Sequence, residues 1–162
     1  MIYLISGKKN QGKTTKLKAL FDGRDNAFGF IANKVFDCGR VTKYELINLR
    51  DGETRTIARL ASIPVPKDWN RTVSHGPFVF SEESFDWAAE IFDNAVRAGG
   101  SEFFLDELGK LELNDQGHAE LIRRAVSSGM DLYITVRDAN IAAAAQKFGL
   151  NEYQVIEVEP RA

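Results

Sequence analysis

The sequence predicts an α/β protein with a mostly parallel central sheet, helices on both faces and an antiparallel hairpin annex. Three observations carry this prediction. Strand-like and helix-like runs alternate along the 162 residues, a length that suits one domain spanning 1–162. Residues 50–53 read Arg-Asp-Gly-Glu between two strand-like runs, and Asp-Gly is a strong hairpin signal. The chain also opens with an apolar run, a glycine- and lysine-rich loop and a helix-like run.

The first half of the chain contains mainly extended patterns. Apolar runs predict strands at 2–5 and 27–32, and the spacing of Leu17, Leu20 and Phe21 predicts a helix at 14–21. The hairpin strands are expected at 41–49 and 54–60, and apolar residues alternate along the first of them. Two prolines predict a loop at 63–69, followed by a short extended run at 77–80.

The second half alternates helices and strands more regularly. Ser81 is the expected N-cap of a helix with an apolar stripe, and Gly99-Gly100 stops that helix. Asn114 or Asp115 is expected to cap the next helix. The predicted elements are a helix to about 97, a strand at 102–105, a helix to about 127, a strand at 131–136, a helix at 139–148 and a strand at 154–158.

Composition and charge narrow the class of protein. The chain is 44% hydrophobic and 27% charged, with a formal net charge of −2. A protein that grips nucleic-acid backbones is usually strongly basic, so nucleic acid is a disfavoured partner. No apolar run approaches a membrane span, and Met1 leads into the first strand without a charged leader, so we expect a cytoplasmic protein with no membrane partner. Cys38 is the single cysteine, which we expect to be half-buried and reduced.

The loop after the first strand has the spacing of a phosphate-binding P-loop, or Walker A motif, Gly7-x-x-x-x-Gly12-Lys13-Thr14. Backbone N–H groups at a helix N-terminus bind phosphate, and the glycines leave room for it. Lys13 would bridge the β- and γ-phosphates and the Thr14 hydroxyl would bind Mg²⁺. The predicted nucleotide-binding residues are Gly7, Lys8, Lys9, Asn10, Gln11, Gly12, Lys13, Thr14 and Thr15. The alternative is a glycine-rich turn without a ligand.

Two residues of this loop depart from the commonest P-loops. Asn10 stands where many P-loops carry another glycine, and asparagine tolerates positive φ better than most residues. Lys8 would add a second cation near the phosphates, or it is a solvated loop lysine.

Residues 103–107, Phe-Phe-Leu-Asp-Glu, form an apolar strand that ends in two acids, the pattern of a Walker B motif. Ligands bind at the carboxyl ends of parallel strands in open α/β sheets. Asp106 would hold Mg²⁺, directly or through water, and Glu107 would act as general base toward an attacking water. The alternative is that both acids cap the following turn. Arg137, just after the strand at 131–136, is a candidate catalytic arginine; alternatively it pairs with Asp138 at the surface.

A family resemblance extends this interpretation over nearly the whole chain. LDELGKLEL at 105–113 resembles the IDEIGKMEL-type signature of the small single-domain P-loop nucleoside-triphosphatases, of the RecA-like, additional-strand class. GKTTKL at 12–17, Gly29-Phe30 and GPFVFSE at 76–82 also resemble this family, in its order. The loop apex, Gly7-Lys8-Lys9-Asn10, differs from the Gly-Pro-Pro-Gly-like apex more usual in the family.

The resemblance implies a P-loop NTPase fold and Mg²⁺-dependent hydrolysis of ATP, GTP and other nucleoside triphosphates to diphosphate and phosphate. It implies broad base selectivity and slow turnover. Family roles carry over directly to Gly12, Lys13, Thr14, Asp106 and Glu107. Gly109 and Lys110 match the signature, which makes Lys110 a candidate for phosphate contact or for holding the turn after the strand.

Two other functions are compatible with these motifs. One is a P-loop phosphotransferase, a kinase of the nucleoside or nucleotide type, with its acceptor in the cleft between the P-loop and the hairpin. The other is a nucleotide-gated binding module with slow hydrolysis, in which the hairpin at 34–60 contacts a protein partner. Four basic residues of that hairpin would form the contact, or they are only a solvated face: Lys34, Arg40, Lys43 and Arg55.

Overall fold

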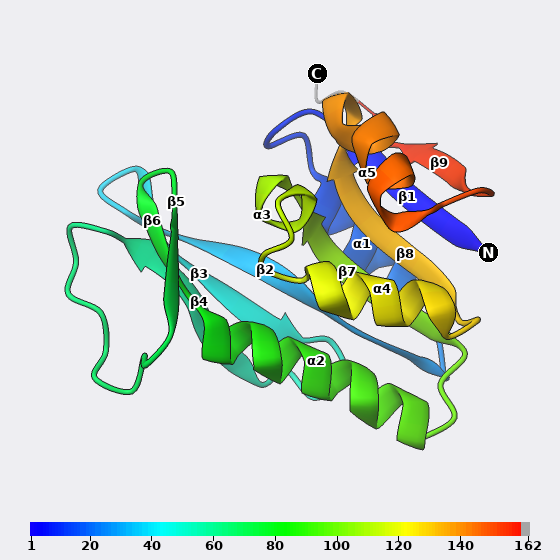
Figure 1. Cartoon of the computed structure of the whole chain (residues 1–162), viewed down its shortest axis with the longest axis horizontal. Helices are drawn as coiled ribbons and strands as arrows, with labels where there is room; N and C mark the ends of the chain where they lie inside the picture. Colours follow the sequence, from blue (N-terminus) through cyan, green and yellow to red (C-terminus); the bar gives the residue numbers. More distant parts are fainter. Residues whose placement is uncertain (160–162) are drawn as a thin grey trace.

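The computed structural model describes residues 1–159, which form one nine-stranded sheet flanked by helices (Figure 1). In chain order the elements are β1 (Ile2–Gly7), α1 (Lys13–Phe21), β2 (Ala27–Asp37), β3 (Arg40–Asn48), β4 (Thr54–Leu60), β5 (Thr72–His75), β6 (Phe78–Ser81), α2 (Glu82–Arg97), β7 (Glu102–Leu108), α3 (Lys110–Leu113), α4 (Ala119–Ser127), β8 (Asp131–Arg137), the 3₁₀ turn η1 (Asp138–Asn140), α5 (Ile141–Phe148) and β9 (Gln154–Glu157).

The sheet has a parallel half and an antiparallel half that share β2. Its strand order is β5-β6-β4-β3-β2-β7-β8-β1-β9. From β2 to β9 the four neighbouring pairs are parallel, and from β2 to β5 the four pairs are antiparallel. The prediction of a mostly parallel sheet is therefore wrong. The predicted hairpin annex continues the main sheet, and strand β5 extends it further. The sequence did not predict β5, because residues 72–75 are few and mostly exposed.

The positions of the other elements follow the predictions closely. Ser81 caps α2 by accepting a hydrogen bond from the backbone N–H of Ser84. The predicted cap at Asn114 or Asp115 is wrong, since α4 begins only after His118 and the short helix α3 precedes it. Asp115 (φ 62°) and Gly117 (φ 61°) both adopt left-handed backbone conformations, which interrupt any helix between α3 and α4.

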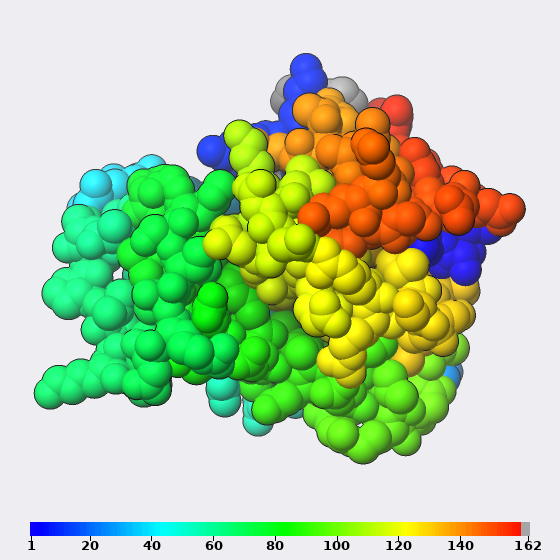
Figure 2. All heavy atoms as spheres, viewed as in Figure 1, coloured from blue at the N-terminus to red at the C-terminus, as the bar shows by residue number. Residues whose placement is uncertain are grey.

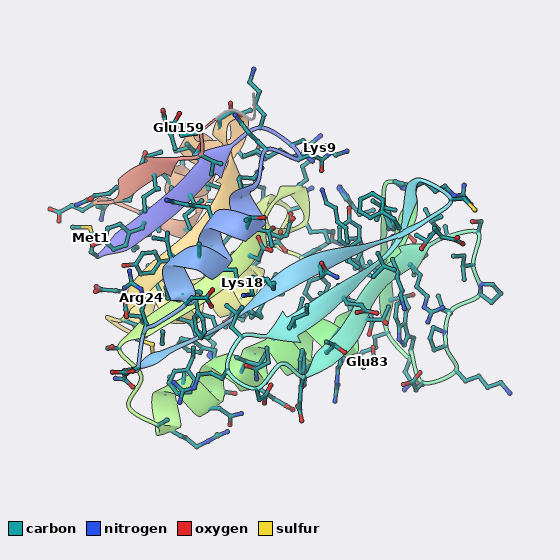
Figure 3. The ribbon with its side chains drawn as sticks, turned by 180° about the vertical axis from the view of Figure 1, so that it is seen from behind. Met1, Lys9, Lys18, Arg24, Glu83 and Glu159 are labelled. Atoms are coloured by element: carbon teal, nitrogen blue, oxygen red, sulfur yellow. The ribbon has the colours of Figure 1, made fainter. Side chains whose placement is uncertain are left out.

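Side chains of successive strand residues enter different cores on the two faces of the sheet. Leu4 and Phe103 pack under α2, α4 and α5, whereas Ile5 and Phe104 pack under α1. Figures 1 and 3 show these two faces, with α2 and α4 in front in the first and α1 in front in the second. In the smaller core Phe104 stacks on Tyr133, with ring centroids 4.4 Å apart. Both faces are thus closed around β1, β7 and β8, which leaves the carboxyl ends of these strands as the open edge.

Two further features concern the periphery. Cys38 is exposed at the turn between β2 and β3, with φ 50°, so the expectation that it is half-buried is wrong. The turn needs its backbone in the left-handed region, which places the side chain in solvent. Within residues 1–159, no helix is long and apolar enough to cross a membrane.

Candidate active site

The loop between β1 and α1 is compact and internally hydrogen-bonded. Gly12 (φ 96°) and Asn10 (φ 61°) adopt left-handed conformations, which asparagine tolerates better than most residues other than glycine. The backbone N–H of Lys8 donates to Gln11 Oε1 at 2.5 Å. A Cβ on Gly7 would lie 3.1 Å from that same oxygen, which explains the glycine at the strand exit.

The lysines of the loop have different surroundings. Lys13 folds back over the loop, and its Nζ donates to the carbonyl oxygen of Lys8 at 2.7 Å. Burial lowers the pKa of Lys13, although the charges of Glu107 and Asp106 act in the opposite direction. Lys8 and Lys9 are exposed, and Figure 3 shows Lys9 at the tip of the loop. Lys13 is therefore the loop lysine placed to contact a bound phosphate.

Asp106 is the point at which three elements meet beneath the loop. Its side chain is almost fully buried and accepts hydrogen bonds from the hydroxyl groups of Thr14 (2.8 Å) and Thr135 (2.6 Å). The backbone N–H of Ala32 donates to it at 2.9 Å. Burial raises the pKa of Asp106, while these hydrogen bonds and the charge of Lys13 oppose the rise. The carboxylate thus ties the start of α1 to β2 and β8.

Glu107 leaves the regular strand and enters the cleft. Its φ is 76°, and the pairing of β7 with β8 is irregular between Leu105 and Leu108. Its backbone N–H donates to Thr135 Oγ1 at 2.8 Å. Glu107 is exposed and lines the cleft, whose walls still remove part of its hydration. This desolvation, followed by the nearby charge of Asp106, raises the pKa of Glu107 to about 7. A carboxylate with this pKa can accept a proton at neutral pH.

Two cations lie beside these acids, and only one was predicted. Arg137 ends β8 next to Gly7 of β1 and lines the same cavity. Asp138 accepts a hydrogen bond from the backbone N–H of Ala139. Within residues 1–159, no ion pair joins Asp138 to Arg137, so the surface-pair alternative finds no support.

The second cation is Lys34, which the sequence analysis placed in a partner-binding patch. Its Nζ donates to Asn10 Oδ1 at the apex of the loop. It reaches there because β2 continues to Asp37, five residues beyond the predicted end of that strand. The extension was not predicted because polar residues follow position 32. The signal that could have placed Lys34 near the loop is its position on the strand that begins at Ala27.

The donor atoms at this site fit a magnesium ion. The Thr14 hydroxyl and the Asp106 carboxylate are adjacent oxygen donors. Mg²⁺ typically takes one or two such protein ligands and completes its octahedron with substrate phosphates and water. Within the part of the chain described, no cluster of three or more His, Cys, Asp or Glu side chains is placed to hold a metal by itself. A metal ion held jointly with a nucleotide is the arrangement that these residues suit.

Most of these side chains border one cavity of about 670 Å³, and buried Asp106 lies behind its wall. Its first wall consists of the loop, the end of β2, Glu107 and Arg137, and its second wall consists of residues from β3, β4, β6 and α3. Lys110 at the start of α3 also lines it, but Glu112 holds the preceding turn by accepting from the N–H of Gly109 at 2.8 Å. Thr14 and Thr15 also border a smaller open groove of about 350 Å³ between α1 and β2. The predicted residues that line the main cavity, around buried Asp106, are Lys9, Asn10, Gln11, Gly12, Lys13, Thr14, Thr15, Glu107 and Arg137; Gly7 and Lys8 do not line it.

Comparison with known proteins agrees with this architecture. A family model described as NTPase matches residues 2–161. The chain belongs to the NTPase family. It is 26% identical over 140 residues to a nucleoside-triphosphatase THEP1 of Thermotoga petrophila, covering 86% of this chain and 74% of that protein. It is 24% identical over 161 residues to a nucleoside-triphosphatase THEP1 of a Thermotoga species, strain RQ2, covering 99% and 88% respectively. No solved structure matched the chain.

Membership of the NTPase family confirms the resemblance noted in the signature at 105–113. The individual roles predicted for Lys13, Thr14, Asp106, Glu107 and Arg137 stay predictions. The geometry adds Lys34 and Thr135 to them, because both contact predicted residues directly.

Proposed function

We propose that this NTPase hydrolyses nucleoside triphosphates, ATP and GTP among them, to diphosphate and phosphate in a Mg²⁺-dependent reaction on a P-loop NTPase fold. One observation carries the proposal: the Thr14–Asp106–Thr135 network lies directly beneath the loop, with Lys13 and Glu107 bordering the same cavity. The names of the two relatives agree with this activity. The cytoplasmic location and a partner for the hairpin stay predictions.

In this proposal each residue of the cleft has a separate role in binding or in catalysis. Loop N–H groups at the start of α1 bind the phosphate chain, and Lys13 exchanges its contact with the Lys8 carbonyl for the β- and γ-phosphates. Thr14 and Asp106 would hold a magnesium ion, Asp106 directly or through water, and such an ion would supply positive charge to the phosphates. Glu107 accepts the proton of a water whose oxygen attacks the γ-phosphorus.

Lys34 and Arg137 complete the charge balance in this proposal. In the transition state negative charge spreads over the γ-phosphoryl oxygens, where a cation accelerates the reaction strongly. Both residues lie at the mouth of the cavity, Lys34 against the loop apex and Arg137 beside the strand that leads into it. A trans-acting arginine is then unnecessary, because the cations come from the same chain.

Phosphate release tests the proposal. ATP, GTP, CTP and UTP are incubated with the protein, with and without Mg²⁺, and compared for wild type, Lys13→Ala and Glu107→Gln. We expect Mg²⁺-dependent release that is lost in Lys13→Ala and lowered roughly a hundredfold in Glu107→Gln. Because the pKa of Glu107 is raised to about 7 and the base must be ionised, wild-type kcat should rise with pH through about 7.

Matched controls separate this result from general damage. Lys16 on α1 and Glu120 on α4 are exposed, so Lys16→Ala and Glu120→Gln should leave kcat unchanged. The proposal fails if wild type binds nucleotide but releases no phosphate. The role of Glu107 fails if Glu107→Gln keeps both the wild-type rate and the rise with pH.

A further inference from the structure

The cavity continues past Glu107 into a space that hydrolysis by water does not need. We call this space the aromatic compartment, and its walls include Tyr44, Phe78, Phe80, Phe85 and His118. Tyr44 meets Phe78 edge to face with ring centroids 5.1 Å apart, and Phe80 stacks on Phe85 at 6.0 Å. Buried aliphatic side chains, among them Leu46 and Ile57, form its floor. Such walls favour a planar, largely apolar ligand.

Strand order places the aromatic compartment on the far side of Glu107 from the loop. The loop follows β1, Glu107 lies near the end of β7, and Tyr44 lies on β3, with two strand intervals on each side of β7. Strands are spaced about 4.8 Å apart, so β1 and β3 lie roughly 10 Å to either side of β7. On the surface in Figure 2, the green segment that contains β5 and β6 borders the yellow-green segment that contains α3.

This position decides which ligand the compartment serves. In phosphoryl transfer the attacking oxygen approaches the γ-phosphorus opposite the leaving diphosphate. A group held beyond Glu107 therefore approaches as an attacking group, while the base of the nucleotide extends away with the diphosphate. The two spaces are continuous, since the loop, Glu107 and Tyr44 line the same cavity. Burial, and then the charge of Glu107, raise the pKa of the Tyr44 hydroxyl.

One polar group in the compartment lacks a partner. His118 is 3% exposed, with its ring 4.8 Å from both Phe30 and Phe85. Its Nδ1 has no hydrogen-bond partner within residues 1–159. Burial lowers the pKa of His118 to about 3, so the imidazole is neutral and suits a neutral ligand. Unpaired buried nitrogens are rare in folded proteins, and ligand sites are one reason for them.

We propose that the aromatic compartment binds a heteroaromatic alcohol that accepts the γ-phosphoryl group in place of water. The proposal rests on the nucleotide site and the general base proposed above. The hydroxyl oxygen forms a bond to the γ-phosphorus as the bond from that phosphorus to the β–γ bridging oxygen breaks. Glu107 takes the hydroxyl proton and later releases it to solvent. The products are a phosphate ester of the alcohol and the nucleoside diphosphate.

The test follows the fate of the γ-phosphate. The full chain is incubated with Mg²⁺ and ATP carrying a radioactive γ-phosphate, plus one alcohol at a time: cytidine, uridine, adenosine, guanosine or pyridoxine. Glycerol and glucose serve as alcohols without an aromatic ring. We expect at least one heteroaromatic alcohol to give a labelled ester at roughly ten times the glycerol rate or more.

A variant in the compartment links the product to this space. Phe78 is partly buried, packs edge to face on Tyr44 and has no role in the proposed hydrolysis. Phe78→Ala should lower ester formation roughly tenfold while phosphate release to water continues at the wild-type rate. Val96→Ala, on an exposed position of α2, should change neither rate. Thermal melts check that each variant folds.

The outcomes separate the two proposals. Phosphate release without any ester overturns the acceptor proposal and leaves hydrolysis standing. Ester formation that Phe78→Ala leaves unchanged, or lowers only together with hydrolysis, overturns the compartment as the acceptor site. If neither phosphate nor ester forms, both proposals fail.

Discussion

Single residues decide how charge is arranged around the cleft. Asp106 and Glu107 are neighbours in sequence but have different surroundings, because the positive φ of Glu107 turns its side chain out of the strand pattern. Asp106 is held by three hydrogen bonds, whereas Glu107 faces the cations Lys34, Lys13 and Arg137. Adjacent acids can thus take different roles, one structural and metal-binding and the other basic.

At the scale of single residues, Lys34 is predicted to affect kcat for phosphate release. Replacing it in Lys34→Ala removes a cation from the apex of the loop, so kcat for phosphate release should fall roughly a hundredfold, with a partial recovery in Lys34→Arg. Lys43→Ala is the matched control, since Lys43 pairs with Glu45 on its own strand. An unchanged kcat in Lys34→Ala would mean that Lys34 only orients Asn10.

Among the secondary-structure elements, the short helix α3 depends on one buried acid, Glu112. Glu112 accepts from the backbone N–H of Gly109 (2.8 Å) and of His118 (2.9 Å), so it closes the turn on both sides of α3. Only glycine fits at 117, because a Cβ there would lie 2.1 Å from Glu112 Oε2. Burial raises the pKa of Glu112 from 4.5 to about 7.

This pKa predicts how stability depends on pH. Since the folded-state pKa of Glu112 lies above the unfolded value, its contribution is fully present below about pH 4.5 and is lost as pH rises through about 7. The free energy of unfolding should therefore fall between pH 5 and pH 8, by up to about 3 kcal/mol from this group, and Glu107 adds to the same trend. Urea unfolding at a series of pH values gives the free energy of unfolding as a function of pH. This dependence on pH should be weaker in Glu112→Gln than in wild type and unaltered in Glu120→Gln. The same dependence on pH in all three proteins would contradict the prediction.

Over the whole molecule, β2 is the strand that joins the parallel and antiparallel halves of the sheet. Gly29 permits this junction, because a Cβ there would lie 2.2 Å from the carbonyl oxygen of Phe104 on β7. The close approach of β2 and β7 also brings the N–H of Ala32 to Asp106. The junction therefore supports the active site as well as the core.

Gly29→Ala tests the junction. The added methyl group must push β2 away from β7, so we expect a loss of about 3 kcal/mol or more in the free energy of unfolding, together with weaker nucleotide binding. Gly52→Ala, in an open turn with φ 77°, should cost only about 1 kcal/mol and leave binding unchanged. Denaturant unfolding and nucleotide titration provide the two readouts. A similar loss in both variants would show that the approach of β2 to β7 is not critical.

The sequence by itself determined the local features of this protein. Hydrophobic periodicity, the Asp-Gly turn and the Ser81 cap predicted most elements, because these signals act between residues close in the chain. The loop spacing and the two acids after 105 likewise identified the residues that converge on the cleft, and the signature at 105–113 identified the family.

Tertiary structure alone decided what depends on strand order and on contacts between distant segments. The equal division of the sheet into parallel and antiparallel halves is one such feature. Two contacts are others: Lys34 reaches Asn10, 24 positions away, and Thr135 contacts Asp106, 29 positions away. The burial of His118 and Glu112 depends likewise on helices and strands packed around them. Periodicity indicates which face of a strand is apolar, but the packing of the whole chain sets the neighbour of each strand. The cavity between the loop at 7–14 and the aromatic walls depends on those neighbours.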